Sequence, residues 1–426
     1  MATKTCDVLV IGGGPAGSTI SALLARDGIN VVLLEKDHHP RFHIGESLLP
    51  NNMPLLDKLG VRAEIEAIGM AKYGATFTSP WHDKTVEYFF ARALDKSLPQ
   101  AYQVRRSVFD EILFKKAGAN GAKTFEGVRA RAVEFPSEGG AQVTVSSEDG
   151  SETIWQARHL VDASGRDTLL ADHFGIKRSN MRHSSAAVYG HFTDARRMEG
   201  KAEGHISVYW FDYGWFWFIP LSDGTTSIGA VCRPDYINSR KTDPTTFFRD
   251  TIAMSPGLSE RLAQATLTGP ATVTGNYSYF SDRMSGPSYL LIGDAFAFVD
   301  PVFSTGVYLA MTTAFWGADV VKTALKDPAR GAAMAQEMEM RIRDGIDVFS
   351  WFIHRMTQPA FRDLFMGPRN ILRVEEAMMS LLAGDIFDNR EALLRLNVFK
   401  GLYYMKSAID KMRGGSPTAP APAKAA

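Results

Sequence analysis

The 426-residue sequence predicts an α/β fold in which a parallel sheet is joined to a separate antiparallel sheet and a helical C-terminal region. At the N-terminus, a buried apolar run, a Gly-rich turn and a helical pattern follow one another, as in a βαβ unit of about thirty residues. Residues 186–231 alternate aromatic, β-branched and polar side chains, which is typical of an antiparallel sheet. Residues from about 330 to 412 are mostly helical in pattern.

The remaining elements are predicted from local patterns. Short apolar runs indicate buried strands, and Gly-rich breaks between alternating runs indicate the turns of a meander. In chain order, the predicted elements are strands at 6–12 and 30–34 around a helix at 18–25, a helix after Arg105-Arg106 to about 118, a meander over 124–161, a strand at 289–292 and a long helix from about Thr305 to Leu325. The Pro- and Ala-rich tail at 413–426 has no packable face, so we expect it to be disordered.

The composition is that of a globular protein and excludes several classes. With 47 basic and 47 acidic residues, the chain has no excess positive charge of the kind that binds nucleic acid. Two cysteines, Cys6 and Cys232, are too few for a disulfide scaffold or a Cys-rich zinc site. No apolar run is long enough to span a bilayer, and the N-terminus leads directly into a strand without a signal peptide. We therefore expect a cytoplasmic protein without a metal site.

A dinucleotide-binding fingerprint is the strongest motif in the chain. Gly12, Gly14 and Gly17 form a Gly-x-Gly-x-x-Gly sequence between the first strand and its helix, with Ala16 inside it. Gly12 allows a tight turn, Gly14 lets a pyrophosphate approach the backbone, and Gly17 allows close packing of helix on strand. The helix N-terminus then offers unpaired N–H groups to the phosphates.

An acidic residue stands where a ribose-binding group is expected. Glu35 ends the second strand, 18 residues after Gly17, close to the spacing at which an acid binds a ribose hydroxyl. The alternative is a Gly-rich turn that binds nothing, but the strand, the helix and the acidic residue all stand at the spacing that the fingerprint requires. The fingerprint by itself does not distinguish NAD from FAD.

Three later segments of the sequence bear on the choice between these cofactors. They are Arg106-x-x-Phe109-Asp110, Asp162-Ala163-Ser164-Gly165 and Gly293-Asp294-Ala295. As an ordered set they resemble the FAD monooxygenase fold typified by p-hydroxybenzoate hydroxylase. The resemblance implies that FAD is the cofactor, that Asp294 holds its ribityl chain and that Arg106 lies near the ribityl–pyrophosphate region. Taken singly, Asp294 could equally be a helix N-cap and Arg106 a solvated surface residue.

The resemblance also implies a division of the chain. We expect a discontinuous FAD-binding Rossmann-type domain over residues 1–75, 100–185 and 271–330. The substrate-domain sheet is expected over residues 76–99 and 186–270, and the C-terminal helical region over residues 331–412.

Two further segments narrow the resemblance. Residues 45–50 read Gly-Glu-Ser-Leu-Leu-Pro, and residues 215–220 read Trp-Phe-Trp-Phe-Ile-Pro. Both are similar to signature segments of the flavin-dependent halogenases, in which the second segment lies near the passage between flavin and substrate. Trp215 and Trp217 are two apart on a predicted strand, so both indoles should face the same side. The alternative is a pair of core tryptophans in an aromatic-rich sheet.

Lys72, between residues 69 and 77, matches the position of the catalytic lysine of that family. Its mostly apolar flanks favour the neutral, nucleophilic amine, because desolvation lowers the pKa of a lysine. By resemblance, the side chain either captures hypohalous acid as a chloramine or holds it, as an ammonium, by a hydrogen bond. The alternative is a solvated lysine before a strand. Lys58, at a predicted helix end, is a comparable lysine with no expected role.

The start of the long helix predicts an anion site. Thr305 and Gly306 would present free N–H groups and a partial positive charge, which suit a halide ion or a flavin anion. An N-cap by Ser304 or Thr305 is the simpler alternative. Tryptophan halogenases carry a glutamate directly before this segment, where this chain has Phe303, so free tryptophan is not the expected substrate. Residues 381–387 also resemble the branch that acts on phenols or pyrroles, often bound to a carrier protein.

The resemblance implies a halogenase of antibiotic or secondary-metabolite biosynthesis. Reduced FAD from a separate NAD(P)H-flavin reductase would react with O2 to give a C4a-hydroperoxide, and a halide ion would attack it. Lys72 would guide the resulting hypohalous acid to a phenol or pyrrole, either free or bound to an acyl or peptidyl carrier protein. Three alternatives stay open: a reductase of the geranylgeranyl reductase type, an NADPH-dependent aromatic hydroxylase and a non-enzymatic flavin-binding sensor.

Overall fold

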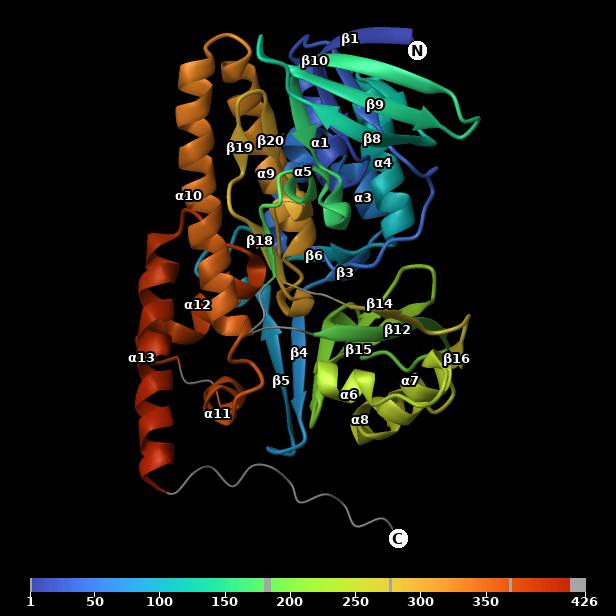
Figure 1. Cartoon of the computed structure of the whole chain (residues 1–426). Coiled ribbons are helices and arrows are strands. Elements are labelled where there is room, and N and C mark those ends of the chain that lie inside the picture. Colours follow the sequence, from blue (N-terminus) through green and yellow to red (C-terminus); the bar gives the residue numbers. More distant parts are fainter. Residues whose placement is uncertain (1, 180–184, 276–277, 368–369, 414–426) are drawn as a thin grey trace.

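The computed structural model describes residues 2–179, 185–275, 278–367 and 370–413. Two large sheets and a layer of long helices form the molecule (Figure 1). In Figure 1 the first sheet lies at the top, the second sheet at the lower right, and the C-terminal helices along the left side. The predicted α/β fold with a second antiparallel sheet and a helical C-terminal region is confirmed.

The first sheet has eight strands with a parallel centre. Its order is β19-β20-β10-β1-β2-β7, and β9 and β8 continue from β10 as the predicted antiparallel meander. Every residue of β2 is buried, which shows that both faces of the sheet are covered. The strands are β1 (Ala2–Ile11), β2 (Val31–Leu34), β7 (Lys123–Phe125), β8 (Val128–Glu134), β9 (Ala141–Ser147), β10 (Glu152–Asp162), β19 (Ser285–Gly286) and β20 (Tyr289–Leu291).

Three helices pack together beside the first sheet. α1 (Pro15–Arg26) contacts both α4 (Arg106–Ala119) and α9 (Gly306–Ala324). The N-terminal ends of all three follow directly on segments that the sequence singled out, namely the fingerprint, Arg105-Arg106 and Ser304-Thr305. Shorter helices α2 (Met53–Leu59), α3 (Arg62–Ile68) and α5 (Leu169–His173) complete this part.

The second sheet also has eight strands and is mostly antiparallel. Its order is β16-β12-β15-β14-β13-β4-β5, and β17 also pairs with β12. Because β17 belongs here, this sheet extends past residue 270. The strands are β4 (Gly74–Ser79), β5 (Lys84–Phe89), β12 (Ala186–Thr193), β13 (Ile206–Phe211), β14 (Gly214–Pro220), β15 (Thr226–Cys232), β16 (Thr266–Leu267) and β17 (Thr272–Thr274).

Two small sheets connect the large ones. β3 (Met70–Lys72) pairs with β6 (Ala101–Gln103), and β11 (Lys177–Ser179), β18 (Tyr279–Ser281) and β21 (Ala297–Phe298) form a three-stranded sheet. An isolated bridge from Ser47 to Gln103 adds the segment after β2 to the β3–β6 pair. Lys72 is therefore held by a ladder that lies between the two large sheets.

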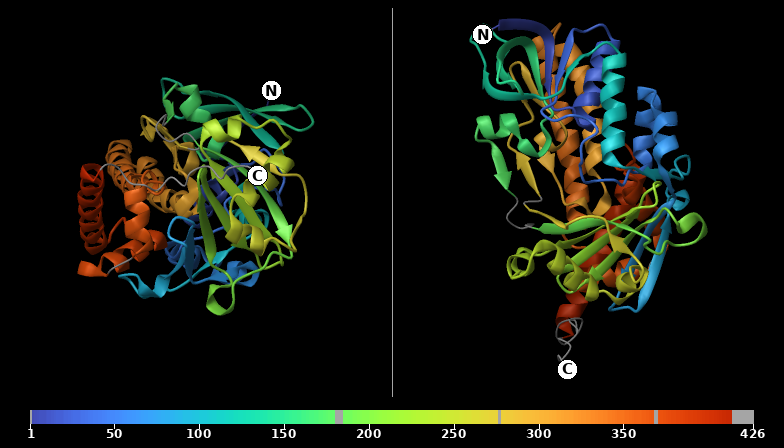
Figure 2. Two further views of the ribbon diagram at one scale, coloured as in Figure 1. Left: turned by 90° about the horizontal axis from the view of Figure 1, so that it is seen from below. Right: turned by 90° about the vertical axis from the view of Figure 1, so that its right-hand side faces the viewer.

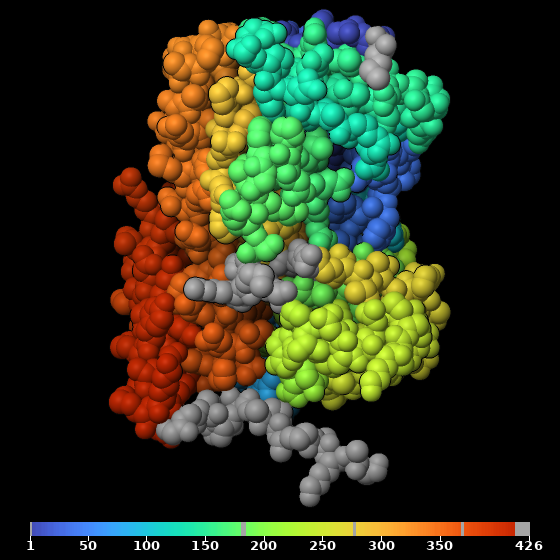
Figure 3. All heavy atoms as spheres, viewed as in Figure 1, coloured from blue at the N-terminus to red at the C-terminus, as the bar shows by residue number. Residues whose placement is uncertain are grey.

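The C-terminal helices close one side of the molecule, as the left view in Figure 2 shows. They are α10 (Pro328–Ile353), α11 (Pro359–Met366), α12 (Val374–Ala383) and α13 (Arg390–Met412), while α6 (Pro234–Asn238), α7 (Pro244–Ala253) and α8 (Pro256–Arg261) cover the second sheet. Space-filling atoms in Figure 3 show these long helices packed against the rest of the chain. The predicted tail from Gly414 lies outside the described residues. Within the described residues, no helix is both long and apolar enough to cross a membrane.

Candidate active site

A cavity of about 610 Å³ lies between the two large sheets. Its walls include the fingerprint turn, residues 41–47, the β14 tryptophans and the start of α9, and of residues 41–47 the sequence had singled out only 45–47. The lining side chains include Glu35, Arg41, Glu46, Ser47, Arg106, Arg166, Trp215, Trp217, Asp294 and Ser304. A volume of this size suits a cofactor.

The three fingerprint glycines fit a bound dinucleotide. A Cβ at Gly12 would lie 2.3 Å from the carbonyl oxygen of Ala163, and a Cβ at Gly17 would lie 1.9 Å from that of Gly12. These two glycines are therefore required by backbone packing. A Cβ at Gly14 would instead point into the cavity, with only the Arg41 guanidinium 3.6 Å away. This open side of Gly14 is the space that a pyrophosphate needs.

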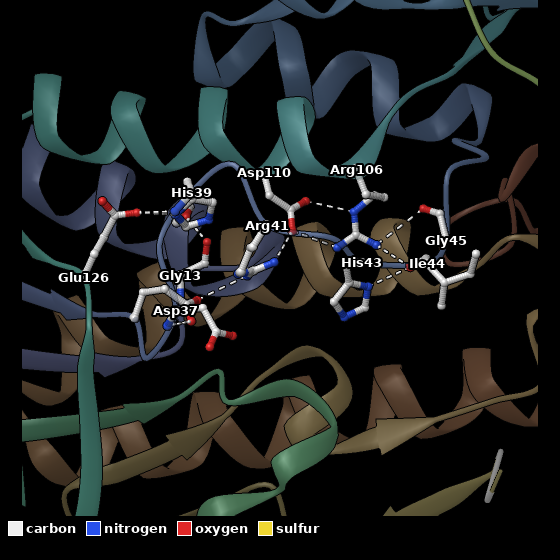
Figure 4. A network of polar contacts seen from close by, with 12 residues as sticks. Gly13, Asp37, His39, Arg41, His43, Ile44, Gly45, Arg106, Asp110 and Glu126 are labelled. Atoms are coloured by element: carbon white, nitrogen blue, oxygen red, sulfur yellow. Dashed lines mark hydrogen bonds and ion pairs between the residues drawn. The ribbon is translucent and has the colours of Figure 1, made fainter. Parts of the chain in front are cut away.

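Glu35 lies at the same turn and joins a chain of buried charges. Its Oε2 accepts a hydrogen bond from the backbone N–H of Gly13 at 2.8 Å and another from Arg41 at 3.2 Å. In Figure 4, Asp110 lies between Arg41 and Arg106 and accepts hydrogen bonds from both. Although burial opposes it, the Arg106 guanidinium together with Arg41 holds the pKa of Asp110 below its usual range.

Arg106 is bound on both sides and is not a solvated surface residue. It forms a two-point contact with Asp110, and its Nη1 donates to the carbonyl of Ile44 at 3.0 Å (Figure 4). Because Asp110 already orients it, Arg106 fixes the path of the segment 41–47 along the cavity.

Asp294 lines the cavity just after β20, where the carboxyl ends of the parallel strands meet. Burial raises the pKa of Asp294 to about 6, and the nearby guanidinium groups of Arg106 and Arg166 oppose that rise. A carboxyl in this position can accept or donate a hydrogen bond to the hydroxyl groups of a sugar-like chain. These residues, with Gly14 and Glu35, fit FAD.

The start of α9 meets the cavity through Ser304 and Gly306, since both line it. A Cβ at Gly306 would meet nothing within 4 Å, so the space beside this residue is open. Thr305 is the N-cap residue, makes no side-chain cap hydrogen bond and is 1% exposed. Of the two predicted halide-binding residues, only Gly306 lines the cavity.

Trp215 and Trp217 line the cavity side by side, with ring centroids 6.2 Å apart. Trp217 Nε1 donates to Ser227 on β15 at 3.1 Å. On the same strand, Gly229 leaves room for the ring, because a Cβ there would lie 2.3 Å from it. Both indoles also belong to the buried core that the second sheet shares with the C-terminal helices. The core and cavity interpretations of the tryptophans therefore both hold.

Lys72 does not line the cavity but lies directly behind its wall. The side chain is 1% exposed, and its Nζ donates to Ser47 Oγ and to the Leu48 carbonyl, each at 2.9 Å. Ser47 in turn lines the cavity. The ring of Phe90 lies 5.3 Å from Nζ. Burial lowers the pKa of Lys72 to about 7, so the neutral amine is accessible near neutral pH.

Lys58 and Phe303, which the sequence analysis set beside the expected site residues, do not line the cavity. Lys58 is exposed, and its backbone carbonyl accepts a hydrogen bond from Arg26 far from the cavity. Phe303 is 3% exposed and belongs to the buried core of the second sheet and the C-terminal helices. In the part of the chain that is described, no group of three or more His, Cys, Asp or Glu side chains could hold a metal.

Comparison with known proteins agrees with this site. Residues 5–339 match the family described as "FAD binding domain". The chain is 31% identical to the 1H-pyrrole-2-carbonyl-(peptidyl-carrier protein) chlorinase of Pseudomonas fluorescens, over 96% of its own length and 95% of that protein. It belongs to the flavin-dependent halogenases.

Two further halogenases and one flavoprotein/dehydrogenase are also similar to this chain. A tryptophan 2-halogenase of Chondromyces crocatus is 37% identical over 74% of this chain, which spans 61% of that longer protein. The solved structure of the myxobacterial chondrochloren halogenase CndH has a TM-score of 0.80 at 31% identity and covers 95% of this chain and 97% of its own. A flavoprotein/dehydrogenase from Cytophaga hutchinsonii has a TM-score of 0.87 at 26% identity, covering 96% of this chain and 100% of its own.

Sequence reasoning missed several side chains of this halogenase cavity. Arg41 and Arg166 line it, and Ser47 contacts the lysine. Ser47 belongs to the halogenase-like segment at 45–50, so this motif could have marked it as a site residue, although the sequence analysis gave it no role. Nothing in the local sequence marks His191, which lies 2.6 Å from Glu46 and comes from β12.

Proposed function

We propose that this halogenase uses reduced FAD, O2 and chloride or bromide to halogenate an electron-rich phenol or pyrrole. The observation that carries this proposal is the position of Lys72. It is a buried amine with a pKa near 7, one hydrogen bond away from a cavity that fits FAD. Ordinary flavin binding requires no such lysine, whereas capture of an oxidised halogen does.

The cofactor is held at the fingerprint end. Gly14 leaves room for the pyrophosphate, Glu35 accepts from a ribose hydroxyl, and Arg106 and Asp294 border the ribityl chain. When bound, reduced FAD supplies the electrons that activate O2 for oxidation of the halide. The Gly306 N–H at the start of α9 offers the halide a partial positive charge.

Lys72 and the tryptophan pair act at the other end. Trp215 and Trp217 fill the space beside the cavity with apolar surface, which excludes water from the passage. Lys72 Nζ then holds the oxidised halogen, either as a neutral amine that bonds to it or as an ammonium that donates a hydrogen bond. Because its present acceptors are a hydroxyl and a carbonyl, both protonation states are accommodated.

The names of the relatives point to two substrate classes, tryptophan and a carrier-bound pyrrole, and one residue of this chain favours the second. The name of the Pseudomonas fluorescens relative states that it acts on a pyrrole bound to a peptidyl carrier protein. Phe303 stands where tryptophan halogenases carry a glutamate, and it is buried, so this chain offers no carboxylate at that point. We therefore propose a carrier-bound or free phenol or pyrrole as substrate, with a separate flavin reductase as partner.

The test is turnover of the purified protein. Chemically reduced FAD is added anaerobically with halide and a panel of free and carrier-bound phenols and pyrroles, air is admitted, and products are read by mass spectrometry. We expect a product in which halogen replaces hydrogen. Rapid bleaching of bound FAD by NADPH alone, together with a hydroxylated product, would instead establish the hydroxylase alternative.

A further inference from the structure

A carboxylate–imidazole pair at the cavity wall has no part in the functions described above. Glu46 Oε1 lies 2.6 Å from His191 Nε2, and the two side chains are 2% and 13% exposed. Glu46 belongs to the segment 41–47, whereas His191 lies on β12 of the second sheet. The two residues are 145 positions apart, so the pair exists only in the folded protein.

The other oxygen of Glu46 is unused. Its Oε2 is buried without a hydrogen-bond partner among the described residues, and Glu46 lines the cavity. Buried carboxylate oxygens are normally hydrogen-bonded, so an unpartnered oxygen on a residue that lines the cavity is a candidate for contact with a bound group. Glu46 lies in sequence between Gly45, whose carbonyl accepts from Arg106, and Ser47, which accepts from Lys72.

The imidazole lies nearer to solvent. Phe42 packs edge-on against His191 with ring centroids 5.9 Å apart, and Phe42 is 60% exposed. Glu46 is thus the inner member of the pair and His191 the outer one.

Halogenation consumes a proton inside the cavity. Reduced FAD (FADH2), O2, a halide anion, an arene C–H and one proton give FAD, the haloarene and two waters, so each turnover consumes a proton inside a cavity between two sheets. We propose that Glu46 and His191 form a proton relay from solvent to this cavity, an inference that rests on the proposed function.

The relay requires no movement of the backbone. His191 takes a proton from solvent at Nδ1 and releases the proton on Nε2 to Glu46 Oε1. Rotation of the carboxyl group about its Cγ–Cδ bond then moves the protonated Oε1 to the position that Oε2 held, where it can donate to a group other than His191. Loss of that proton returns Glu46 to the carboxylate, and tautomer exchange restores His191. General acid–base transfers of this type contribute about 10²- to 10⁴-fold to rate.

The chain provides a matched control pair. His39 Nδ1 lies 2.7 Å from Glu126 Oε1, and the His39 side chain is 2% exposed (Figure 4). Neither residue lines the cavity. Replacement of Glu126 therefore removes a carboxylate–imidazole contact of the same kind without touching the proposed relay.

Three variants of the full-length protein test the relay: Glu46→Gln, His191→Ala and Glu126→Gln. We expect Glu46→Gln and His191→Ala to form haloarene roughly 100-fold more slowly than wild type, and Glu126→Gln to match it. Added imidazole should restore His191→Ala at least about tenfold but leave Glu46→Gln unchanged, because only the former lacks the imidazole. The FAD dissociation constant should stay within about threefold of wild type in all three variants.

A second readout needs neither flavin nor turnover. In the flavin-free protein, ¹⁵N NMR should show a hydrogen-bonded proton on His191 Nε2 that is lost in Glu46→Leu, which has no acceptor, and kept in Glu126→Gln. An unchanged His191 signal in Glu46→Leu, wild-type rates in Glu46→Gln, or a failure of imidazole to restore His191→Ala would each overturn the relay alone. A wild-type protein that makes no haloarene would overturn the proposed function and the relay with it.

Discussion

At the cofactor end of the cavity, Asp110 lies between the guanidinium groups of Arg41 and Arg106, and Glu35 accepts from Arg41 as well. At the lysine end, Lys72 is equally buried, but its Nζ bonds to the hydroxyl of Ser47 and the carbonyl of Leu48, and no carboxylate pairs with it among the described residues. Charges that are paired with opposite charges stay ionised when buried, whereas an unpaired amine loses its proton more easily.

The difference separates binding from chemistry. Paired arginines and carboxylates keep a constant charge over the physiological pH range and are suited to hold a cofactor in place. An amine whose pKa lies near 7 is suited to exchange a proton or to act as a nucleophile. Arg41, Arg106 and Asp110 thus form a paired group beside the fingerprint, whereas the Lys72 amine has no paired carboxylate among the described residues.

Removing the paired carboxylate should have the largest effect on the fold. Asp110→Asn leaves Arg41 and Arg106 buried without their shared counter-ion, and we expect the free energy of unfolding to fall by about 3–5 kcal/mol. The depressed pKa of Asp110 stabilises the wild type above pH 3.8, the usual value, and this contribution is lost as the pH falls further. Urea unfolding at neutral and acidic pH measures both effects. A variant as stable as wild type would show that the pairing is unimportant.

Two fingerprint glycines should respond differently. A Cβ at Gly14 enters only the cavity, so Gly14→Val should bind FAD roughly 100-fold more weakly with a Tm within about 3 °C of wild type. Gly17→Ala places its Cβ against the Gly12 carbonyl and should lower the free energy of unfolding by about 3 kcal/mol.

Flavin fluorescence titration and thermal melts distinguish the two glycine variants. If Gly14→Val retains FAD as wild type does, the pyrophosphate is not bound at this turn. If Gly17→Ala melts as wild type does, close packing at Gly17 is not required.

At the lysine end, the effect on stability should depend on alkaline pH. Because Lys72 has a pKa of about 7 in the folded protein against the ordinary lysine value of 10.5, the unfolded chain binds more protons between these limits. The stability of wild type relative to Lys72→Met should therefore rise by about 1.4 kcal/mol per pH unit in that window. Urea unfolding of both proteins from pH 7 upward measures it. Parallel stability curves would mean that Lys72 is not desolvated.

Local patterns predicted the cofactor end better than the lysine end. The helix from Arg106 and the start of α9 depend on residues that are close in sequence, and the structure places both within one or two residues of the prediction. The helix after the fingerprint begins at Pro15, three residues before the predicted start. The family resemblance identified Lys72, but not that Ser47 would stand between it and the cavity, because 25 residues and a strand pairing separate them. Likewise, Glu46 and His191 meet only through the packing of two sheets.

The central claim is that Lys72 acts on the halogen and not on the flavin. It is tested most directly by mixing Lys72→Ala with reduced FAD, O2, halide and an accepted arene, with Lys58→Ala as the exposed-lysine control. We predict that Lys72→Ala loses haloarene while reoxidising FAD at nearly the wild-type rate, and that Lys58→Ala retains both activities. Haloarene formation by Lys72→Ala would contradict the claim, and slowed reoxidation in that variant would place the lysine at the flavin instead.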